Sequence, residues 1–232
     1  IIVATLNSGS LINSLISSIN KQTLKQFEVI FVDGGSTDDT LKKIVESSNF
    51  KFTIINCPCI GIYEALNAGI KQAKYSHYVV IGSDDIFYPD AIDIFSKAIN
   101  EYGDNFRYIC FTVDTDEGCQ KPLGKPWRYL HRSFISQHSV GSLINKYTHD
   151  TYGDYDINYR VGADADFIMK LAQVEPIHFI DVQVGKYALD GTSQTGNLRG
   201  FFDTMLIHLR YQKNILTKLL IVFKFIKVLW RL

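Results

Sequence analysis

Residues 78–85, Tyr78-Val79-Val80-Ile81-Gly82-Ser83-Asp84-Asp85, form an apolar run that ends abruptly in two adjacent acids. The run predicts a buried β-strand, and the amphipathic stretch that follows Pro89 predicts a helix. In open α/β sheets, ligands bind in the crevice beyond the carboxyl ends of the strands, where this prediction places both acids. Adjacent carboxylates repel each other, and their hard oxygens suit Mg²⁺ or Mn²⁺. One interpretation of Asp84 and Asp85 is therefore a divalent-cation site formed by the two acids. A helix N-cap is the alternative interpretation of the acids alone.

Composition sets the limits on the class of protein. The 232 residues are 46% hydrophobic, which suffices for one large domain or for a domain with an extension. Lys+Arg and Asp+Glu both number 24, so no global charge favours nucleic acid as a partner. The four cysteines follow no metal-ligand spacing, and their low number predicts a reducing, cytoplasmic location. The chain begins in an apolar run typical of a first strand, so we expect no signal peptide and a few residues missing before Ile1.

Short apolar runs alternate with amphipathic stretches over residues 1–113. Helices are expected over residues 11–19, from about residue 37, over 62–73 and after residue 89. This alternation predicts an α/β fold with βαβ units and a mostly parallel, Rossmann-like sheet flanked by helices. No Gly-x-Gly-x-x-Gly fingerprint follows the first strand, which argues against a nicotinamide or flavin enzyme. The predicted strands are Ile1–Leu6, Phe27–Val32, Phe52–Asn56, Tyr78–Ile81, Tyr108–Val113 and, later in the chain, Phe179–Val184.

Asp33 ends the second predicted strand, directly before two glycines. A carboxylate in this position can accept hydrogen bonds from a ribose hydroxyl or a base N–H, and Gly34 and Gly35 let the backbone approach a ligand closely. An ordinary turn acid is the alternative. The regular alternation weakens after residue 114, and residues 114–135 are expected to form an irregular loop. This loop either belongs to an acceptor site or is a surface connection.

Five segments, taken in order, resemble the family 2 glycosyltransferases, which have the GT-A fold. Each segment is modest alone, but their order and spacing make the set specific, and the match extends from residue 1 to about residue 193. The resemblance implies a GT-A catalytic domain over residues 1–195, with a nucleotide-sugar-binding part (1–113) and an acceptor-binding part (114–195). The segments are IVATLN (2–7), VDGGSTDDT (32–40), GIYEALNAGI (61–70), GSDD (82–85) and GADADF (162–167).

The resemblance also implies the reaction. It is the inverting transfer of a sugar from a nucleotide-sugar, most often UDP-linked, to the hydroxyl of a glycan or lipid-linked acceptor, as in bacterial polysaccharide biosynthesis. Asp84 matches the last acid of the family's Asp-x-Asp motif and would bind Mn²⁺ or Mg²⁺, although Gly82 replaces the first acid. Asp164 matches the acid of the family's Glu-Asp pair and would be the general base, although Ala163 replaces the Glu; Asp166 is the second candidate base. The residues implied in nucleotide-sugar binding are Thr5, Asn7, Asp33, Ser36, Gly61, Asn67 and Asp84.

The two departures from the family pattern keep another interpretation open, in which the chain is a catalytically degenerate, nucleotide-binding scaffold. A nucleotidyltransferase is a third interpretation. It would usually carry a Gly-rich loop with a Lys or Arg after the first strand, and residues 7–10 (NSGS) contain no base. His138 and His178 are additional candidates for acceptor or phosphate contacts, and ordinary structural or surface histidines are the alternative.

Residues 196–232 are predicted to form a C-terminal helical extension. Within residues 210–232, five bases are expected on one helical face and apolar side chains on much of the remainder. The bases interrupt the apolar run, which stays well short of the ~20 residues that a bilayer crossing needs. A basic amphipathic helix with Trp and Phe predicts peripheral contact with an anionic membrane at its cytoplasmic face. Packing on the catalytic domain, or on a second subunit of a homo-oligomer, is the alternative. The bases are Arg210, Lys213, Lys224, Lys227 and Arg231.

Overall fold

Three parallel strands form the amino-terminal half of the computed structural model, which describes residues 1–58, 61–103, 106–125, 130–136, 139–188 and 198–230. They are β1 (Ile2–Thr5), β2 (Val29–Asp33) and β3 (Phe52–Asn56), paired in that order. β2 is buried along its whole length, as expected for a parallel strand that is covered on both faces. Because the strands are parallel, their carboxyl ends meet at one edge, where Thr5 pairs with Asp33.

A second, mixed sheet continues from the first. A parallel bridge from Ile2 to Val80 connects β1 to the end of β4, and the strand order is then β4-β8-β6-β9-β5, with β7 paired to β6. β6 and β9 are parallel, whereas the other pairings in this sheet are antiparallel. The strands are β4 (His77–Val79), β5 (Ile86–Phe87), β6 (Tyr108–Thr115), β7 (Gly118–Gln120), β8 (Ser142–Asn145) and β9 (His178–Lys186).

The predicted α/β fold with a helix-flanked sheet is confirmed, but the sheet is mixed in its second half. β8 has four residues, all of them buried, so it lacks the alternation that indicates a strand from sequence. Residues 114–135, expected to be irregular, contain β7 and a short 3₁₀ helix over Leu130–Ser133. β6 also runs through the expected division at residue 113, so both predicted parts of the domain share one sheet.

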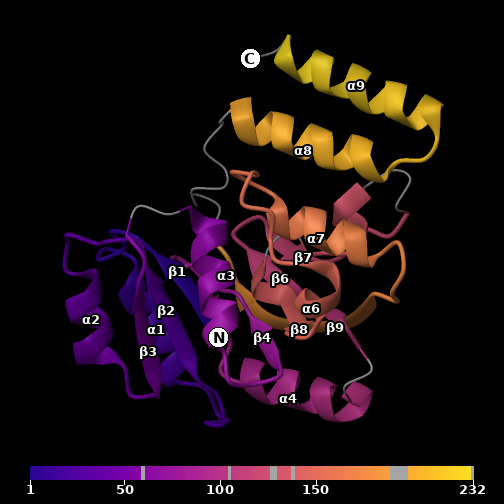
Figure 1. Ribbon diagram of the computed structural model, residues 1–232. Coiled ribbons are helices and arrows are strands. Elements are labelled where there is room, and N and C mark those ends of the chain that lie inside the picture. Colours follow the sequence, from indigo (N-terminus) through magenta and orange to yellow (C-terminus); the bar gives the residue numbers. More distant parts are fainter. Residues whose placement is uncertain (59–60, 104–105, 126–129, 137–138, 189–197, 231–232) are drawn as a thin grey trace.

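Helices cover both faces of the sheet (Figure 1). One core contains Val3, Phe31 and the inner faces of α1 (Ile12–Asn20), α2 (Thr40–Ser47) and α4 (Ala91–Tyr102). The other contains Ile2 and packs α3 (Ile62–Gln72) and α7 (Ala163–Leu171), with the short α6 (Thr148–Tyr152) close to α7. Gly69 brings α3 close to the strands, because a Cβ at this position would lie 2.7 Å from the Ile2 side chain.

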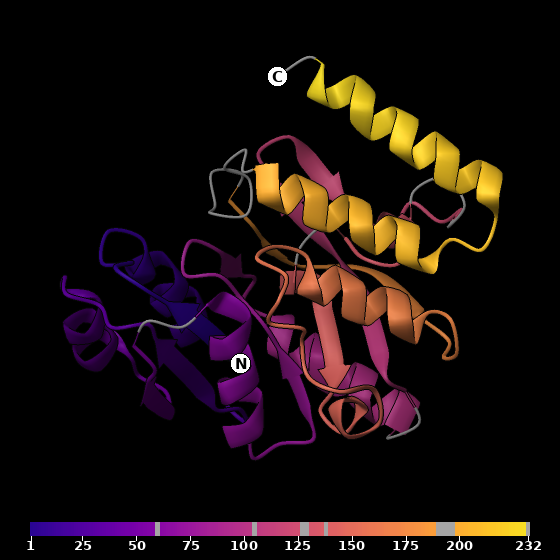
Figure 2. The same ribbon diagram turned by 45° about the horizontal axis from the view of Figure 1, so that its top comes forward.

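Two further helices, α8 (Leu198–Tyr211) and α9 (Ile215–Leu229), pack against each other at the carboxyl end of the chain (Figures 1 and 2). The prediction of one helix through residues 210–232 is wrong. The chain leaves the helical conformation at residues 212–214, and the Asn214 side chain accepts a hydrogen bond from the Leu216 N–H (2.8 Å), which caps α9. Within the described ranges, none of the helices combines the length and apolar content that a membrane crossing requires. The predicted boundary at residue 195 lies outside the described residues.

Candidate active site

The loops that follow β1, β2 and β4 meet at the carboxyl edge of the sheet. The Gly34 N–H donates a hydrogen bond to the Thr5 carbonyl oxygen (2.8 Å), which joins the loops after β2 and β1. The Ser83 hydroxyl donates to the Ser8 hydroxyl (2.9 Å), which joins the loops after β4 and β1. The structure therefore places five of the predicted site residues in neighbouring loops at this edge: Thr5, Asn7, Asp33, Ser36 and Asp84.

Asp33 is buried and holds together the turn that follows β2. Its Oδ2 accepts hydrogen bonds from the N–H groups of Gly35 (3.0 Å) and Ser36 (2.9 Å), and its Oδ1 accepts one from the Ser36 hydroxyl (2.5 Å). An ionised carboxylate offers about four acceptor positions, so these three hydrogen bonds leave capacity for a ligand N–H. The turn role and the ligand-binding role, which were alternatives in the sequence, are thus compatible.

Asn7 and Thr5 shape the adjacent loop. Asn7 has a left-handed backbone conformation (φ 49°), which Asn adopts more readily than most residues, and its Oδ1 accepts a hydrogen bond from the Thr37 N–H (2.9 Å). The Thr5 hydroxyl is buried and has no hydrogen-bond partner in the described part of the chain. Leaving a buried hydroxyl unpaired costs about 1–3 kcal/mol, and a polar ligand at the carboxyl end of β1 would supply the missing partner.

The two adjacent acids after β4 have different surroundings. Asp85 is 1% exposed; its Oδ2 accepts a hydrogen bond from the Gly82 N–H (2.9 Å) and its Oδ1 accepts one from the Ala188 N–H (3.1 Å). Asp84 is half-buried and makes no hydrogen bond or ion pair with any described residue. Asp85 therefore holds the loop through two backbone hydrogen bonds, and Asp84 is the more accessible of the two candidate cation ligands.

A single carboxylate fits the cation that the sequence predicts. Among the described residues, no three His, Cys, Asp or Glu side chains are grouped so that they could hold a metal ion. Mg²⁺, however, commonly binds one or two carboxylates together with water and substrate phosphates, so that a protein cage is not required. Gly82 explains the missing acid, because a Cβ there would lie 2.6 Å from both Asp84 Oδ1 and Asp85 Oδ2.

Asp164 lies in the first turn of α7, where the helix dipole favours a negative charge. The Tyr63 hydroxyl of α3 donates a hydrogen bond to Asp164 Oδ1 (2.9 Å) and accepts one from the Gly162 N–H (2.7 Å). Burial and the nearby Asp164 charge hold the pKa of Tyr63 well above its usual value, so the hydroxyl stays protonated as a donor. Asp164 and Val80 line the same small hollow, which places Asp164 beside the end of β4.

Asp166, the second candidate base, is bound by α8. Arg210 Nη1 lies 3.1 Å from Asp166 Oδ1, and the Tyr211 hydroxyl donates a hydrogen bond to the same oxygen (3.1 Å). The hydrogen bond and the charge of Asp166 raise the pKa of Arg210, as expected for an ion pair. Because Asp166 is buried and already paired, Asp164 is the better candidate base. Arg210, expected on a membrane-facing surface, instead holds α8 against α7.

Two further residues predicted to bind the donor have other partners. The buried Asn67 side chain donates a hydrogen bond to the Tyr155 carbonyl oxygen (2.9 Å) and accepts one from the Tyr155 N–H (3.0 Å). Both ends of the amide are thereby occupied, and Asn67 joins α3 to the loop that precedes α7. The Gly61 N–H donates to Glu64 Oε2 (2.7 Å) and so belongs to the start of α3.

The two candidate histidines add nothing to this site. His178 begins β9, at the amino end of the parallel strands and so opposite the edge that carries Asp84. Its ring contacts that of Tyr102 in a tilted arrangement, with a centroid distance of 4.7 Å. His138 lies outside the described residues. Conversely, Tyr63 was not among the predicted site residues, because its partner Asp164 is 101 residues away in the chain.

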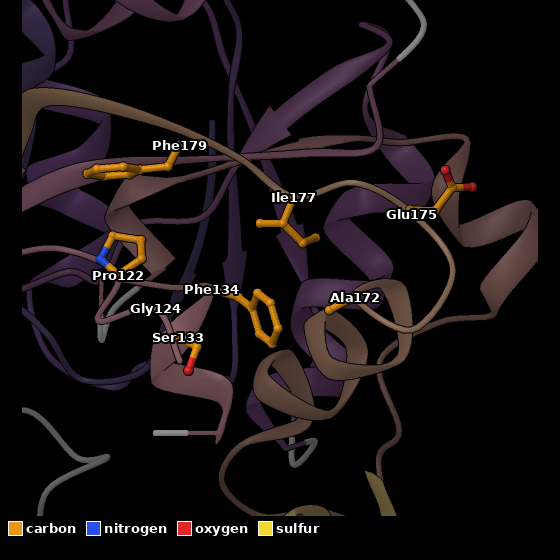
Figure 3. Close-up of a pocket in the computed structure, with 8 residues that line it drawn as sticks. All are labelled: Pro122, Gly124, Ser133, Phe134, Ala172, Glu175, Ile177 and Phe179. Atoms are coloured by element: carbon orange, nitrogen blue, oxygen red, sulfur yellow. The ribbon is translucent and has the colours of Figure 1, made fainter. Parts of the chain in front are cut away.

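A separate cavity of about 390 Å³ lies near the carboxyl end of α7, the helix that carries Asp164 in its first turn (Figure 3). None of the predicted site residues lines it, so it is not the proposed donor site. Its lining combines apolar side chains with polar groups, and Glu175 is the acid among the lining residues. These are Pro122, Gly124, Ser133, Phe134, Ala172, Glu175, Ile177 and Phe179.

The fold and this edge together define an α/β protein with a candidate ligand site beyond the carboxyl ends of its parallel strands. Comparison with known proteins gives the family. The family model described as Glycosyl transferase family 2 matches residues 1–170, and the chain belongs to this family.

Relatives and solved structures agree with the assignment. The PGL/p-HBAD biosynthesis glycosyltransferase of Mycobacterium bovis (strain BCG) is 30% identical over 185 residues, which cover 72% of this chain and 66% of that protein. An uncharacterized glycosyltransferase of Rickettsia prowazekii is 33% identical over 193 residues, covering 77% and 60%. The chain thus spans about two thirds or less of the length of these relatives.

Among solved structures, S. aureus TarS 1-349 in complex with UDP-GlcNAc matches with a TM-score of 0.69 at 18% identity, covering 97% of this chain and 70% of that one. The mannosyltransferase PcManGT of Pyrobaculum calidifontis, in complex with GDP-Man and Mn²⁺, matches with a TM-score of 0.62 at 17% identity, covering 90% and 60%. At these identities the likeness shows the fold, and the predicted GT-A fold is confirmed.

Proposed function

We propose that the protein transfers a sugar from a nucleotide-sugar, UDP-linked, to an acceptor hydroxyl with inversion at the anomeric carbon. The observation that carries this proposal is a half-buried carboxylate, Asp164, that Tyr63 orients beside the strand edge holding Asp84. Family membership supports the reaction type. Structural neighbours in complex with UDP-GlcNAc or GDP-Man support the donor class, and the mycobacterial relative's role in PGL/p-HBAD biosynthesis supports a lipid-linked or glycan acceptor.

The loops after β1 and β2 would hold the nucleoside. The unpaired Thr5 hydroxyl and the remaining acceptor capacity of Asp33 are available to its polar groups. Asp84 would hold Mn²⁺ or Mg²⁺, and the Mn²⁺ in one structural neighbour supports this assignment. When bound, such a cation stabilises the negative charge that develops on the diphosphate leaving group.

Asp164 would act as the general base. Its carboxylate accepts the proton of the acceptor hydroxyl while that oxygen bonds to the anomeric carbon, and the bond to the diphosphate breaks with its electron pair leaving on the diphosphate. Attack opposite the leaving group inverts the configuration in one step, so no enzyme nucleophile is needed. Tyr63 occupies Oδ1 of Asp164 and leaves Oδ2 for the acceptor. A positioned base contributes about 10²–10⁴-fold to the rate.

We expect Tyr63→Phe to lower kcat roughly 10-fold to 100-fold, because a hydrogen bond to a charged group contributes about 1.5–3 kcal/mol. The KM for the donor should stay unchanged. The matched control is Tyr155→Phe, which removes another buried hydroxyl whose partner is Tyr78. In an Asp164→Asn background, Tyr63→Phe should cause no further loss of kcat. Equal losses in both tyrosine variants, or additive losses with Asp164→Asn, would show that Tyr63 acts only through folding.

The first test of the proposal is the thermal stabilisation of the protein by a panel of nucleoside diphosphates, with and without Mn²⁺. A ligand at ~100 times its Kd adds ~2.7 kcal/mol of stability, which a melting curve resolves. We expect the largest shift with UDP plus Mn²⁺, and release of UDP from a UDP-sugar in the presence of acceptor. Stabilisation without turnover against a broad acceptor panel would instead favour the nucleotide-binding scaffold. No shift with any nucleotide would contradict the donor site.

The cellular location stays a prediction. The low cysteine content favours the cytoplasm, and Cys57, Cys110 and Cys119 are free thiols. An acceptor that is linked to a lipid would place the enzyme at the cytoplasmic face of a membrane.

A further inference from the structure

Helix α9 presents apolar side chains on two opposite faces. Ile221 and Phe225 are buried against α8, where they contact Phe201, Met205 and Leu209. Seven other apolar side chains of this segment are 47–88% exposed, and they define what we call the outer face of α9. A surface helix of a globular protein normally carries one apolar face, and a contiguous exposed apolar patch marks an interaction site. The outer face consists of Ile215, Leu216, Leu219, Leu220, Phe223, Ile226 and Trp230.

The outer face is a largely apolar sector of the helix surface with Lys227 near one edge. At 3.6 residues per turn, its seven positions fall within a sector of about 140° around the helix axis. α8 adds a row of exposed apolar side chains at spacings of four residues, Leu198, Phe202 and Leu206. This row lies next to the α8 residues that contact α9. α9 is the outermost element on this side of the molecule (Figures 1 and 2).

The positive charge of residues 204–232 indicates which kind of partner the outer face would bind. The whole chain has a net charge of zero, but no acid follows Asp203, and residues 204–232 contain six bases. Arg210 is paired with Asp166, whereas Lys213, Lys218 and Lys227 make no ion pair with the residues that the structure describes. Two copies of the chain packed through the outer face would bring these like charges together, which disfavours self-association. An anionic surface satisfies both the bases and the apolar side chains.

We infer that the outer face of α9 docks into the interface of an anionic lipid membrane. The leucines and Phe223 enter the boundary between head groups and acyl chains, and the lysines lie among the anionic head groups. Trp230, 88% exposed, occupies the depth at which Trp is enriched in membrane proteins. α8 lies between α9 and the candidate active site, to which Arg210 and Tyr211 attach it. A bound α9 therefore keeps the Asp164 region near the lipid surface.

The test is flotation of the whole chain with vesicles of phosphatidylcholine alone, or of phosphatidylcholine with phosphatidylglycerol. We expect the protein to float with the anionic vesicles and to dissociate as salt is raised, because salt screens the head-group charge. The double variant Leu219→Glu/Phe223→Glu should have an affinity for the anionic vesicles that is lower by roughly tenfold or more. It loses two apolar contacts with the lipid and gains two negative charges. Both positions are exposed, so its melting temperature should match the wild type.

The matched control, Val45→Glu/Val174→Glu, places two glutamates at exposed apolar positions on α2 and after α7. It should float as the wild type does. Failure of the wild type to float with anionic vesicles, or equal flotation of the Leu219/Phe223 variant, would overturn the inference. So would a wild-type dimer, measured by light scattering, that the same variant dissociates, because the occupant would then be a second copy. The stabilisation of the protein by UDP is measured in parallel. This second measurement distinguishes a failure of the proposed donor site from a failure of membrane docking.

Discussion

Asp164→Asn is expected to lower kcat by about 10²–10⁴-fold while leaving the Kd for the nucleoside diphosphate unchanged. Asn has nearly the same shape as Asp, and its carbonyl oxygen can accept the Tyr63 hydrogen bond, so α7 should keep its position. It cannot, however, take a proton from the acceptor hydroxyl. The measurement is steady-state release of the nucleoside diphosphate, together with calorimetric titration of that nucleotide.

Asp166→Asn is the control from the same helical turn. It breaks the ion pair with Arg210, so we expect a lower melting temperature and a smaller loss of kcat than in Asp164→Asn. A larger loss of turnover in Asp166→Asn at a temperature where both variants are folded would contradict the assignment and make Asp166 the base. Loss of nucleotide binding together with turnover in Asp164→Asn would mark Asp164 as structural.

The part of the site that could be predicted from the sequence is the part that local patterns determine. A buried apolar run followed by a polar residue indicates the carboxyl end of a strand, and in a parallel sheet these ends share an edge. Asp33 was predicted at the end of the second strand for this reason, and in the structure β2 ends at Asp33, which pairs with Thr5 of β1. The turn after β2 was equally predictable, because Asp33 accepts hydrogen bonds from residues two and three positions later.

The remainder depends on partners that are distant in sequence. The sequence alone does not distinguish Asp84 from Asp85. In the structure, Asp85 is buried and accepts a hydrogen bond from the N–H of Ala188, which is 103 residues later in the chain. The amide of Asn67 is paired across 88 residues. The periodicity of the sequence placed Arg210 on a basic helical face. In the structure, however, the helix ends one residue later, at Tyr211, and the charge of Arg210 is paired with that of Asp166. Periodicity gives the face on which a side chain lies and carries no information on which distant group meets it.

We expect Asp84→Ala to abolish the Mn²⁺-dependent part of nucleotide stabilisation. Asp84 makes no hydrogen bond or ion pair with described residues, so its removal should leave the melting temperature of the free protein nearly unchanged. The ~2.7 kcal/mol expected for the wild type at ~100 times its Kd should fall to the value measured without metal. Turnover should fall with it, because the charge of the leaving group is no longer neutralised.

Asp85→Ala, the matched change at the next residue, should have the opposite signature. It leaves the part-buried N–H groups of Gly82 and Ala188 without their carboxylate acceptor, at a cost of at most about 1–3 kcal/mol for each. For a chain of this size, each kcal/mol corresponds to a fall of roughly 2–4 °C in Tm. The variant that remains folded should still respond to Mn²⁺, because the Asp84 carboxylate is intact. If Asp85→Ala instead removes the Mn²⁺ response without lowering Tm, then Asp85 is the cation ligand and the carboxylate of Asp84 is not.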